Sequence, residues 1–307
     1  MNCLILGGNG FIGSHLIDRL VSEGHRVRVY DKYKELYRPE KVKVDYRYGD
    51  FSNRILLAEA LVDVDIVFHL ITTTLPKTSN ENPIFDVQTN VIETIYLLEQ
   101  CVAKKIKKIV FASSGGTIYG AKENSPIHES YPTDPECSYG ITKLTIEKYL
   151  ALFYQLHGLD YVIVRPSNPY GCRQNPSGSQ GAISVFLGRV VQNKPIEVWG
   201  DGEVVRDYIF IDDLVDGIYK ASFKKTLSKI FNLGSGEGRS LNEVIQVIRS
   251  VVGREVIVNY TDSRSFDVNK IWLDVSRAKK QLSWCPRIPL EKGIEQTFNF
   301  INHISIK

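Results

Sequence analysis

A buried strand that runs directly into a glycine-rich turn opens the chain, and this feature limits the possible folds more than any other. Residues 3–6 are apolar, and glycines follow them with the spacing Gly-x-x-Gly-x-x-Gly before a predicted helix. Glycine allows a tight turn, a close approach to a pyrophosphate, and close packing of the helix on the strand. Taken alone, the motif fits a plain turn equally well. As a dinucleotide site, the turn and the helix start would contribute Gly7, Gly10, Phe11, Ile12 and Gly13.

Strand-like and helix-like segments alternate after this turn. Short β-branched or aromatic runs predict further buried strands at 27–30, 66–68, 109–111 and 161–164. The segments between the strands predict helices at 11–23, 54–62, 83–103 and 138–157. This alternation is typical of an α/β fold with a Rossmann-like, doubly wound parallel sheet that helices cover on both faces. Two later runs, 208–211 and 230–233, are expected to return to the sheet.

The pattern loosens after Pro166, where Gly, Pro, Ser and Asn gather and short helices and strands mix. We therefore expect a nucleotide-binding domain over 1–165, with returning segments at about 206–235. A smaller, mixed α/β substrate domain would comprise 166–205 and 236–307. Ligands of such sheets bind beyond the carboxyl ends of the strands.

The composition argues against several other classes of protein. The 307 residues include 38 basic and 35 acidic side chains, so no strong positive charge favours a nucleic-acid partner. Five scattered cysteines without a Cys-x-x-Cys pair argue against a disulfide framework or a metal site. No apolar run approaches the roughly 18 residues of a membrane span, and the N-terminus lacks the basic flank of a signal peptide. We expect a cytoplasmic protein.

An acidic residue at the end of the second predicted strand favours NAD as the cofactor. Asp31 follows Gly13 by 18 residues, where a carboxylate can accept hydrogen bonds from the ribose hydroxyls and would repel the 2′-phosphate of NADP. The neighbouring Lys32 weakens this preference slightly. Asp50 and Phe51 are expected to follow a further strand, the third of the sheet in chain order, and could flank the adenine, although Asp50 also suits the region of a helix N-cap.

Tyr139 and Lys143 stand four residues apart at the start of a predicted helix, so their side chains share one face. A tyrosine ordinarily titrates near pH 10. A lysine ammonium and an oxidised nicotinamide nearby would favour the phenolate and lower that pKa. The pair alone could be an exposed helix pair, but it follows a strand that ends in Ala112-Ser113-Ser114. It therefore predicts an acid–base centre.

The chain resembles the extended short-chain dehydrogenases/reductases of the NAD-dependent epimerase/dehydratase family, and among them most the UDP-sugar 4-epimerases. The resemblance runs nearly end to end. Besides the glycine turn and the Tyr-x-x-x-Lys pair, its motifs are Val67-Phe68-His69-Leu70, Asn90-Val91, residues 113–120 (Ser-Ser-Gly-Gly-Thr-Ile-Tyr-Gly), residues 165–171 (Arg-Pro-Ser-Asn-Pro-Tyr-Gly), Arg206-Asp207-Tyr208, Asn232-Leu233-Gly234-Ser235 and residues 264–268 (Arg-Ser-Phe-Asp-Val).

The resemblance implies roles for individual residues. Tyr139 would be the base and acid at the sugar O4, and Lys143 would also hold the nicotinamide ribose. Further contacts to the cofactor would come from Leu70, Asn90, Ser113 and Pro166. Contacts to the substrate would come from Ser114, Asn168, Trp199 along the uracil, and Arg206 and Arg264 as a clamp on the diphosphate. Without the resemblance, Asn168 is interpreted as a turn residue and Arg206 as a surface ion-pair residue.

Three positions depart from the family pattern. Gly115 occupies the place of a Ser or Thr that shares the substrate proton, and Ser114 or Thr117 could supply the hydroxyl instead, unless each bonds local backbone. Glu93 and Phe266 replace glycines, and Phe266 would narrow the pocket near the second arginine of the clamp.

The resemblance implies inversion of C4 of a UDP-hexose through a transient 4-keto intermediate. Both UDP-glucose/UDP-galactose and their N-acetyl forms stay possible substrates, because Ile271 is intermediate in size at the position that selects between them. Gly116-Thr117 lacks the acid and base of a 4,6-dehydratase and the Glu of a uronate decarboxylase. A NAD(P)H-dependent 4-keto-deoxysugar nucleotide reductase and a non-catalytic NAD(P)-binding regulator stay as alternatives; Asp31 argues against the first, and the Tyr-x-x-x-Lys pair against the second.

The resemblance also implies a homodimer, formed by the helices near 83–103 and 138–157 as a four-helix bundle. A role in nucleotide-sugar supply for polysaccharide biosynthesis is the expected setting.

Overall fold

The structure, a computed structural model, describes residues 1–120, 125–262 and 270–305. The chain forms two compact units that interleave in the sequence. Unit 1 comprises Met1–Gly120, Pro132–Arg165 and Ile218–Phe231. Unit 2 comprises Ala121–Tyr131, Pro166–Gly217 and Asn232–Lys307. The predicted assignment of a nucleotide-binding and a substrate domain gives functions to parts of the chain and stays a prediction.

Unit 1 is built on a seven-stranded parallel sheet with the order β11-β6-β5-β4-β1-β2-β3. The α/β fold with a Rossmann-like parallel sheet is therefore confirmed, as are the five predicted strands of the first half. The strands are β1 (Asn2–Leu6), β2 (Arg26–Asp31), β3 (Val44–Tyr48), β4 (Ile66–His69), β5 (Lys108–Ala112), β6 (Asp160–Pro166) and β11 (Ile230–Leu233).

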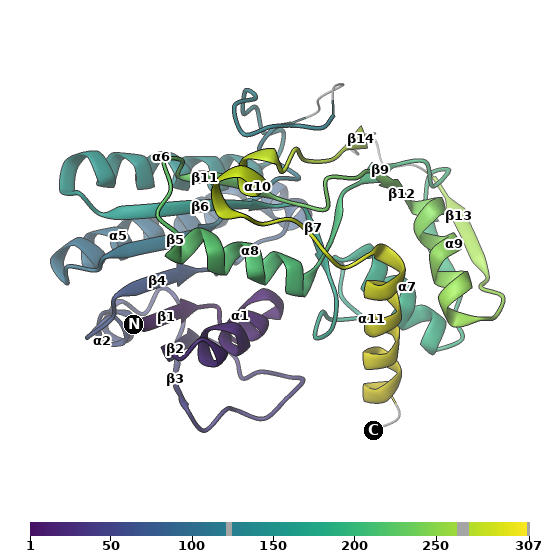
Figure 1. Ribbon diagram of the computed structural model, residues 1–307, viewed down its shortest axis with the longest axis horizontal. Helices are drawn as coiled ribbons and strands as arrows, with labels where there is room; N and C mark the ends of the chain where they lie inside the picture. Colours follow the sequence, from purple (N-terminus) through teal and green to yellow (C-terminus); the bar gives the residue numbers. More distant parts are fainter. Residues whose placement is uncertain (121–124, 263–269, 306–307) are drawn as a thin grey trace. The chain divides into compact units, whose positions relative to one another are not determined.

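Helices cover both faces of this sheet (Figure 1). On one face, apolar side chains of α2, α5 and α6 form a single buried cluster with alternate strand residues such as Leu4, Val67 and Ile109. On the other face lie α1 and the second half of α8, where the ring of Phe223 is 6.5 Å from that of Phe68. The helices are α1 (Phe11–Ser22), α2 (Arg54–Ala60), α3 (Pro76–Glu81), α4 (Pro83–Asp86), α5 (Glu93–Ala103), α6 (Ser138–His157) and α8 (Ile211–Phe223).

The helix predicted over 83–103 is interrupted. Between α4 and α5 lies a π-helical segment, η1 (Val87–Ile92). Within it, the side-chain amide of Asn90 donates to the backbone carbonyl of Asp86 at 3.2 Å. In a regular α-helix that carbonyl would accept the backbone N–H of residue 90. The side chain takes the place of this backbone bond at the point where the helix widens.

Unit 2 contains three small sheets, with the orders β10-β7, β12-β9-β14 and β13-β8. The prediction that 208–211 returns to the main sheet is wrong: β10 pairs in parallel with β7, and Ile211 begins α8. Helix α11 packs against α7 and α9. The elements are β7 (Asn168–Tyr170), α7 (Ala182–Val191), β8 (Ile196–Trp199), β9 (Val205–Arg206), β10 (Tyr208–Phe210), β12 (Arg239–Ser240), α9 (Leu241–Val252), β13 (Val258–Thr261), β14 (Lys270–Ile271), α10 (Ser276–Leu282) and α11 (Leu290–Ser305).

Within the described residues, no helix is long and apolar enough to cross a bilayer. Among these same described residues, no group of three or more His, Cys, Asp or Glu side chains could hold a metal ion.

Candidate active site

The glycine turn between β1 and α1 is closely packed at its first and last glycines, Gly7 and Gly13. Gly7 has a φ of +80°, a conformation that favours glycine, and its N–H donates to the carbonyl of Tyr30 at 2.9 Å. A Cβ on Gly13 would lie 2.3 Å from the carbonyl oxygen of Gly7. The turn and the helix end thus form a close backbone cradle, which fits a pyrophosphate. The other predicted contacts at this end of α1 are Gly10, Phe11 and Ile12.

Asp31 ends β2 beside this turn. Its carboxylate accepts hydrogen bonds from the backbone N–H of Asn9 at 2.9 Å and of Tyr33 at 3.0 Å. Burial raises the pKa of Asp31, and these N–H groups partly offset the increase. The carboxylate therefore links the glycine turn to the segment that follows β2, where the ribose of the adenosine is predicted.

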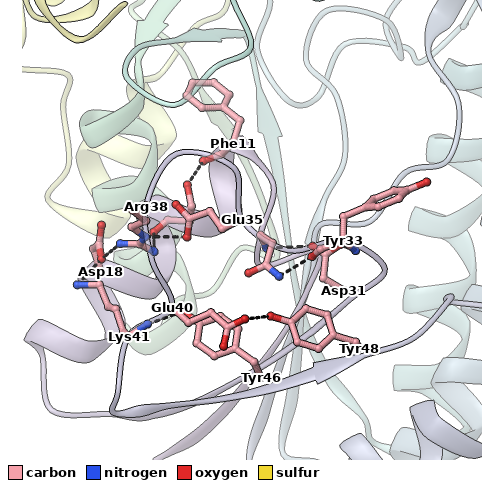
Figure 2. A network of polar contacts seen from close by, with 12 residues as sticks. Phe11, Asp18, Asp31, Tyr33, Glu35, Arg38, Glu40, Lys41, Tyr46 and Tyr48 are labelled. Atoms are coloured by element: carbon pink, nitrogen blue, oxygen red, sulfur yellow. Dashed lines mark hydrogen bonds and ion pairs between the residues drawn. The ribbon is translucent and has the colours of Figure 1, made fainter. Parts of the chain in front are cut away.

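A charged network ties the segment after β2 to α1 (Figure 2). Arg38 forms ion pairs with Asp18 and Glu35 and donates to the carbonyl of Ser14 at 2.8 Å. Lys41 also pairs with Asp18, at 2.7 Å. This network could not be predicted from the sequence, because no local pattern links side chains such as Asp18 and Arg38 that lie 20 residues apart in the chain.

Asp50 and Phe51 follow β3 and differ in their surroundings. The Asp50 carboxylate accepts hydrogen bonds from the N–H and hydroxyl of Ser52 and pairs with Lys32 at 3.0 Å, which lowers its pKa to about 2. The ring of Phe51 is buried in the core, 5.2 Å from that of His69. Their contacts with an adenine stay predictions.

Tyr139 and Lys143 share one face of α6, as their spacing predicts. The Lys143 ammonium lies 5.6 Å from the centre of the Tyr139 ring and donates to the carbonyl of Ala112 at 2.9 Å. Burial lowers the pKa of Lys143 to about 8. The expected lowering of the Tyr139 pKa is not found: burial raises it, and the charges of Cys137 and Asp86 add to the increase. Desolvation of the phenolate is the largest cause of this shift.

Two hydroxyls near this pair are buried and have no hydrogen-bond partner among the described residues. They are Ser113 Oγ and Thr117 Oγ1. Ser113 follows β5, where its N–H donates to the carbonyl of Val164 at 2.8 Å. Thr117 lies beside the first turn of α6, since a Cβ on Gly140 would be 3.0 Å from its carbonyl oxygen. Ser114 is half-buried. Unpartnered buried hydroxyls are expected where a bound ligand supplies the missing bond.

A buried polar network that was not predicted from the sequence holds the first turn of α6. The side-chain amide of Asn90 donates to the carboxylate of Asp86 at 2.8 Å and to Thr73 Oγ1 at 2.8 Å. Asp86 also accepts a hydrogen bond from the hydroxyl of Ser138, the first residue of α6. The predicted cofactor contact Asn90 is thereby linked to the residue before Tyr139.

Two more residues of unit 1 are placed by the structure. Leu70 follows β4, with its N–H donating to the carbonyl of Leu6 at 3.0 Å, and it lies close to the glycine turn. Glu93, which departs from the family pattern, pairs with Arg54 at 3.2 Å and so connects α5 to α2.

Three of the predicted substrate contacts, Asn168, Trp199 and Arg206, belong to unit 2. Asn168 donates its N–H and its side-chain amide to the carbonyl of Asp207 at 2.9 and 3.0 Å. Trp199 ends β8 and is half exposed. Arg206 lies in β9 and donates to the carbonyl of Val205 at 2.9 Å. Pro166, a predicted cofactor contact, is also in unit 2. Arg264 and Phe266 lie outside the described residues.

Residues 3–234 match the model of the NAD dependent epimerase/dehydratase family. A putative UDP-glucose 4-epimerase of Methanocaldococcus jannaschii is 35% identical over 98% of both chains. A dTDP-4-dehydro-6-deoxyglucose reductase of Escherichia coli is 34% identical over 97% of this chain and 96% of the relative. The structure is similar to that of a UDP-glucose 4-epimerase of Thermotoga maritima with UDP-glucose, at 32% identity, full coverage of both chains and a TM-score of 0.93.

Proposed function

Because the chain belongs to the NAD-dependent epimerase/dehydratase family, we propose that it inverts C4 of a UDP-hexose by way of a transient 4-keto sugar. The observation that carries this proposal is the pairing of Tyr139 with Lys143 on one face of α6, next to two buried hydroxyls without partners. A phenol, an ammonium and a spare hydroxyl are the groups that proton exchange at a secondary alcohol requires.

NAD fits the residues of unit 1. The glycine cradle would hold its pyrophosphate, Asp31 its adenosine ribose, and Lys143 its nicotinamide ribose. When bound, NAD supplies a hydride acceptor and a positive charge beside the phenol. Contacts from Leu70, Asn90, Ser113 and Pro166 stay part of this proposal.

Tyr139 would accept the proton of the 4-hydroxyl as C4 loses its hydride, and would return a proton after the hydride has come back to the other face. The phenol must lose its proton, so the raised pKa of Tyr139 has to fall when positive charge is added next to it. Lys143 supplies part of that charge. Thr117 would carry the hydroxyl that Gly115 lacks, because its oxygen is buried without a described partner; Ser114 is the second candidate.

The nucleotide end of the substrate would be held by Asn168, Trp199, Arg206 and Arg264. Two paired guanidinium groups suit a diphosphate. A hexose that is held only through its nucleotide can rotate between removal and return of the hydride, so that its other face meets the cofactor. Ile271 is buried and intermediate in size, so it does not decide whether the substrate is a plain or an N-acetylated hexose.

A reductase of 4-keto sugars is the second candidate function, and one relative carries that name. Such an enzyme needs a supply of NAD(P)H, whereas an epimerase recovers its cofactor in every turnover. A regulator would bind NAD without turnover. The decisive test is a panel of UDP-, GDP- and dTDP-hexoses, each assayed for C4 inversion without added NADH. Inversion supports the proposal; NADPH-dependent reduction or bound cofactor without turnover supports an alternative.

We also propose a homodimer through the helical segments near 83–103 (α4, η1 and α5) and 138–157 (α6). Large apolar side chains are exposed on one face of α6, where Ile141 is 51% and Leu152 is 42% exposed. Phe85 and Ile92, in the segments that pack on α6, are also exposed. An exposed apolar surface of this kind is typical of a protein interface.

A further inference from the structure

Asp86 is a fully buried carboxylate that the proposed mechanism does not use. It ends α4, and its oxygens accept hydrogen bonds from Thr74 Oγ1 at 2.5 Å, from the amide of Asn90 at 2.8 Å and from Ser138 Oγ at 2.7 Å. All three donors are neutral. A buried carboxylate is stable in the charged form only when hydrogen bonds or an opposite charge compensate for the lost water.

The first turn of α6 is held from outside the helix. The N–H of Ser138 donates to Asn80 Oδ1 at 2.9 Å, and that of Tyr139 to Ser79 Oγ at 3.0 Å. The Ser138 hydroxyl binds Asp86. A negative charge at this end is also favourable for the helix dipole. The position of the Tyr139 ring therefore depends on contacts made by α3 and α4.

The buried cation on which the charge of Asp86 acts is Lys143. Its hydrogen bond goes to the neutral carbonyl of Ala112, and it faces Tyr139, His69 and Glu147. Burial lowers the pKa of His69 to about 3, so this ring is neutral. Glu147 is matched by its own cation, because both of its oxygens bind Arg165.

Asp86, in contrast, forms no ion pair with a cation within the described residues, and its donors are all neutral. The charges of both Asp86 and Glu147 raise the pKa of Lys143 against the effect of burial. Without Asp86, a larger part of Lys143 would be a neutral amine at pH 7 to 8.

We propose that Asp86 is a positioning residue of this site, which fixes the first turn of α6 through Ser138 and keeps Lys143 an ammonium beside Tyr139. This inference rests on the proposed function. Asp86 acts through other residues and is not itself a catalytic residue.

Two variants separate the effect of Asp86 on Lys143 from its effect on the helix, and a third is the control. Asp86→Asn removes the charge and Ser138→Ala removes only the link to the helix. Asp63→Asn makes the same chemical change as the first variant on an exposed turn of unit 1, where the φ of +58° suits asparagine. Each holoenzyme is assayed for kcat and KM between pH 6 and 10. Bound NAD is measured at each pH as the amount that stays with the protein through gel filtration.

In the wild-type protein both kcat and NAD retention are expected to fall as the pH rises through about 8, where Lys143 loses its proton. Asp86→Asn is expected to move this fall about one pH unit lower. It is expected to lower kcat about tenfold or more, with KM within about twofold, because Asp86 is only the smallest of the causes that raise the pKa of Tyr139 but the largest one that raises the pKa of Lys143. Ser138→Ala is expected to lower kcat roughly 3–10-fold, the effect of one hydrogen bond, without moving the fall.

A pH profile and kcat of Asp86→Asn equal to those of Asp63→Asn would overturn the inference. If Asp86→Asn does not fold, as judged by circular dichroism, Ser138→Ala decides: a lowered kcat supports the inference and an unchanged kcat overturns it. If the wild-type protein inverts no nucleotide sugar, the proposed function fails, and the pH dependence of NAD retention still tests Asp86.

Discussion

Tyr139 and Lys143 show how far residue-scale reasoning from the sequence reaches. Their spacing of four predicted a shared helix face, and the two side chains do lie together on α6. The predicted lowering of the Tyr139 pKa is not found, because burial by segments far away in the chain raises it. The contact between Asp86 and Ser138, on which the role proposed for Asp86 rests, was not predicted because the two residues lie 52 positions apart in the chain.

Tyr139→Phe tests the acid–base role. The variant keeps the ring and loses only the phenol oxygen, so we expect KM to change little and kcat to fall by about 10²–10⁴-fold. Steady-state kinetics on the best substrate of the panel measures both, and thermal unfolding shows whether the fold is retained. Near-full activity would exclude Tyr139 as the base.

The open question of the replacement hydroxyl is tested by Thr117→Val and Ser114→Ala. Thr117 Oγ1 is the buried, unpartnered oxygen, so Thr117→Val is expected to lower kcat by about tenfold or more. Ser114→Ala is expected to stay within about threefold of wild type. The reverse order of the two kcat values would assign the hydroxyl to Ser114.

At the scale of elements, local patterns located six of the seven strands of the main sheet but gave no range for β3, and they did not predict every pairing. Residues 208–211 form a strand-like run, yet β10 pairs with β7 instead of with the main sheet. The strand with which β10 pairs depends on which sheet edge is available to it in the folded chain. The interruption of the helix over 83–103 was also missed, because it follows from the side-chain contacts of Asn90.

Gly13→Ala tests the close packing of α1 on the turn. The added Cβ would meet the backbone of Gly7 at 2.3 Å and of Gly8 at 2.6 Å, and backbone cannot move as a side chain does. We expect a loss of about 1–3 kcal/mol in the free energy of unfolding and little bound NAD. Gly10→Ala is the matched control, since its Cβ would meet nothing closer than 3.4 Å. Equal stability of the two variants would contradict this account of the turn.

Ile141→Asp tests the proposed interface on α6. A charge in the centre of an apolar interface opposes association, so we expect sedimentation to change from dimer to monomer. Leu227→Asp, at a position that is 98% exposed, is the control and should sediment as the wild type does. A wild-type protein that sediments only as a monomer would refute the interface.

On the scale of the whole molecule, the alternation of strands and helices was enough to predict the fold class, and the motif blocks were enough to predict the family. The interleaving of the two units was not predictable in detail, because short segments such as 218–231 are assigned by contacts with residues far away in the chain. The roles of Asn168, Trp199 and Arg206 depend on such contacts and stay predictions.

The central claim is that hydrogen leaves C4 of the sugar and returns to it without exchange. The most direct test incubates the enzyme with UDP-galactose, or with the best substrate of the panel, in D₂O and examines the product by NMR. The account predicts the C4 epimer with protium at C4 and no consumption of added NADH. Deuterium at C4, or no epimer from any nucleotide sugar while NAD is bound, would contradict it.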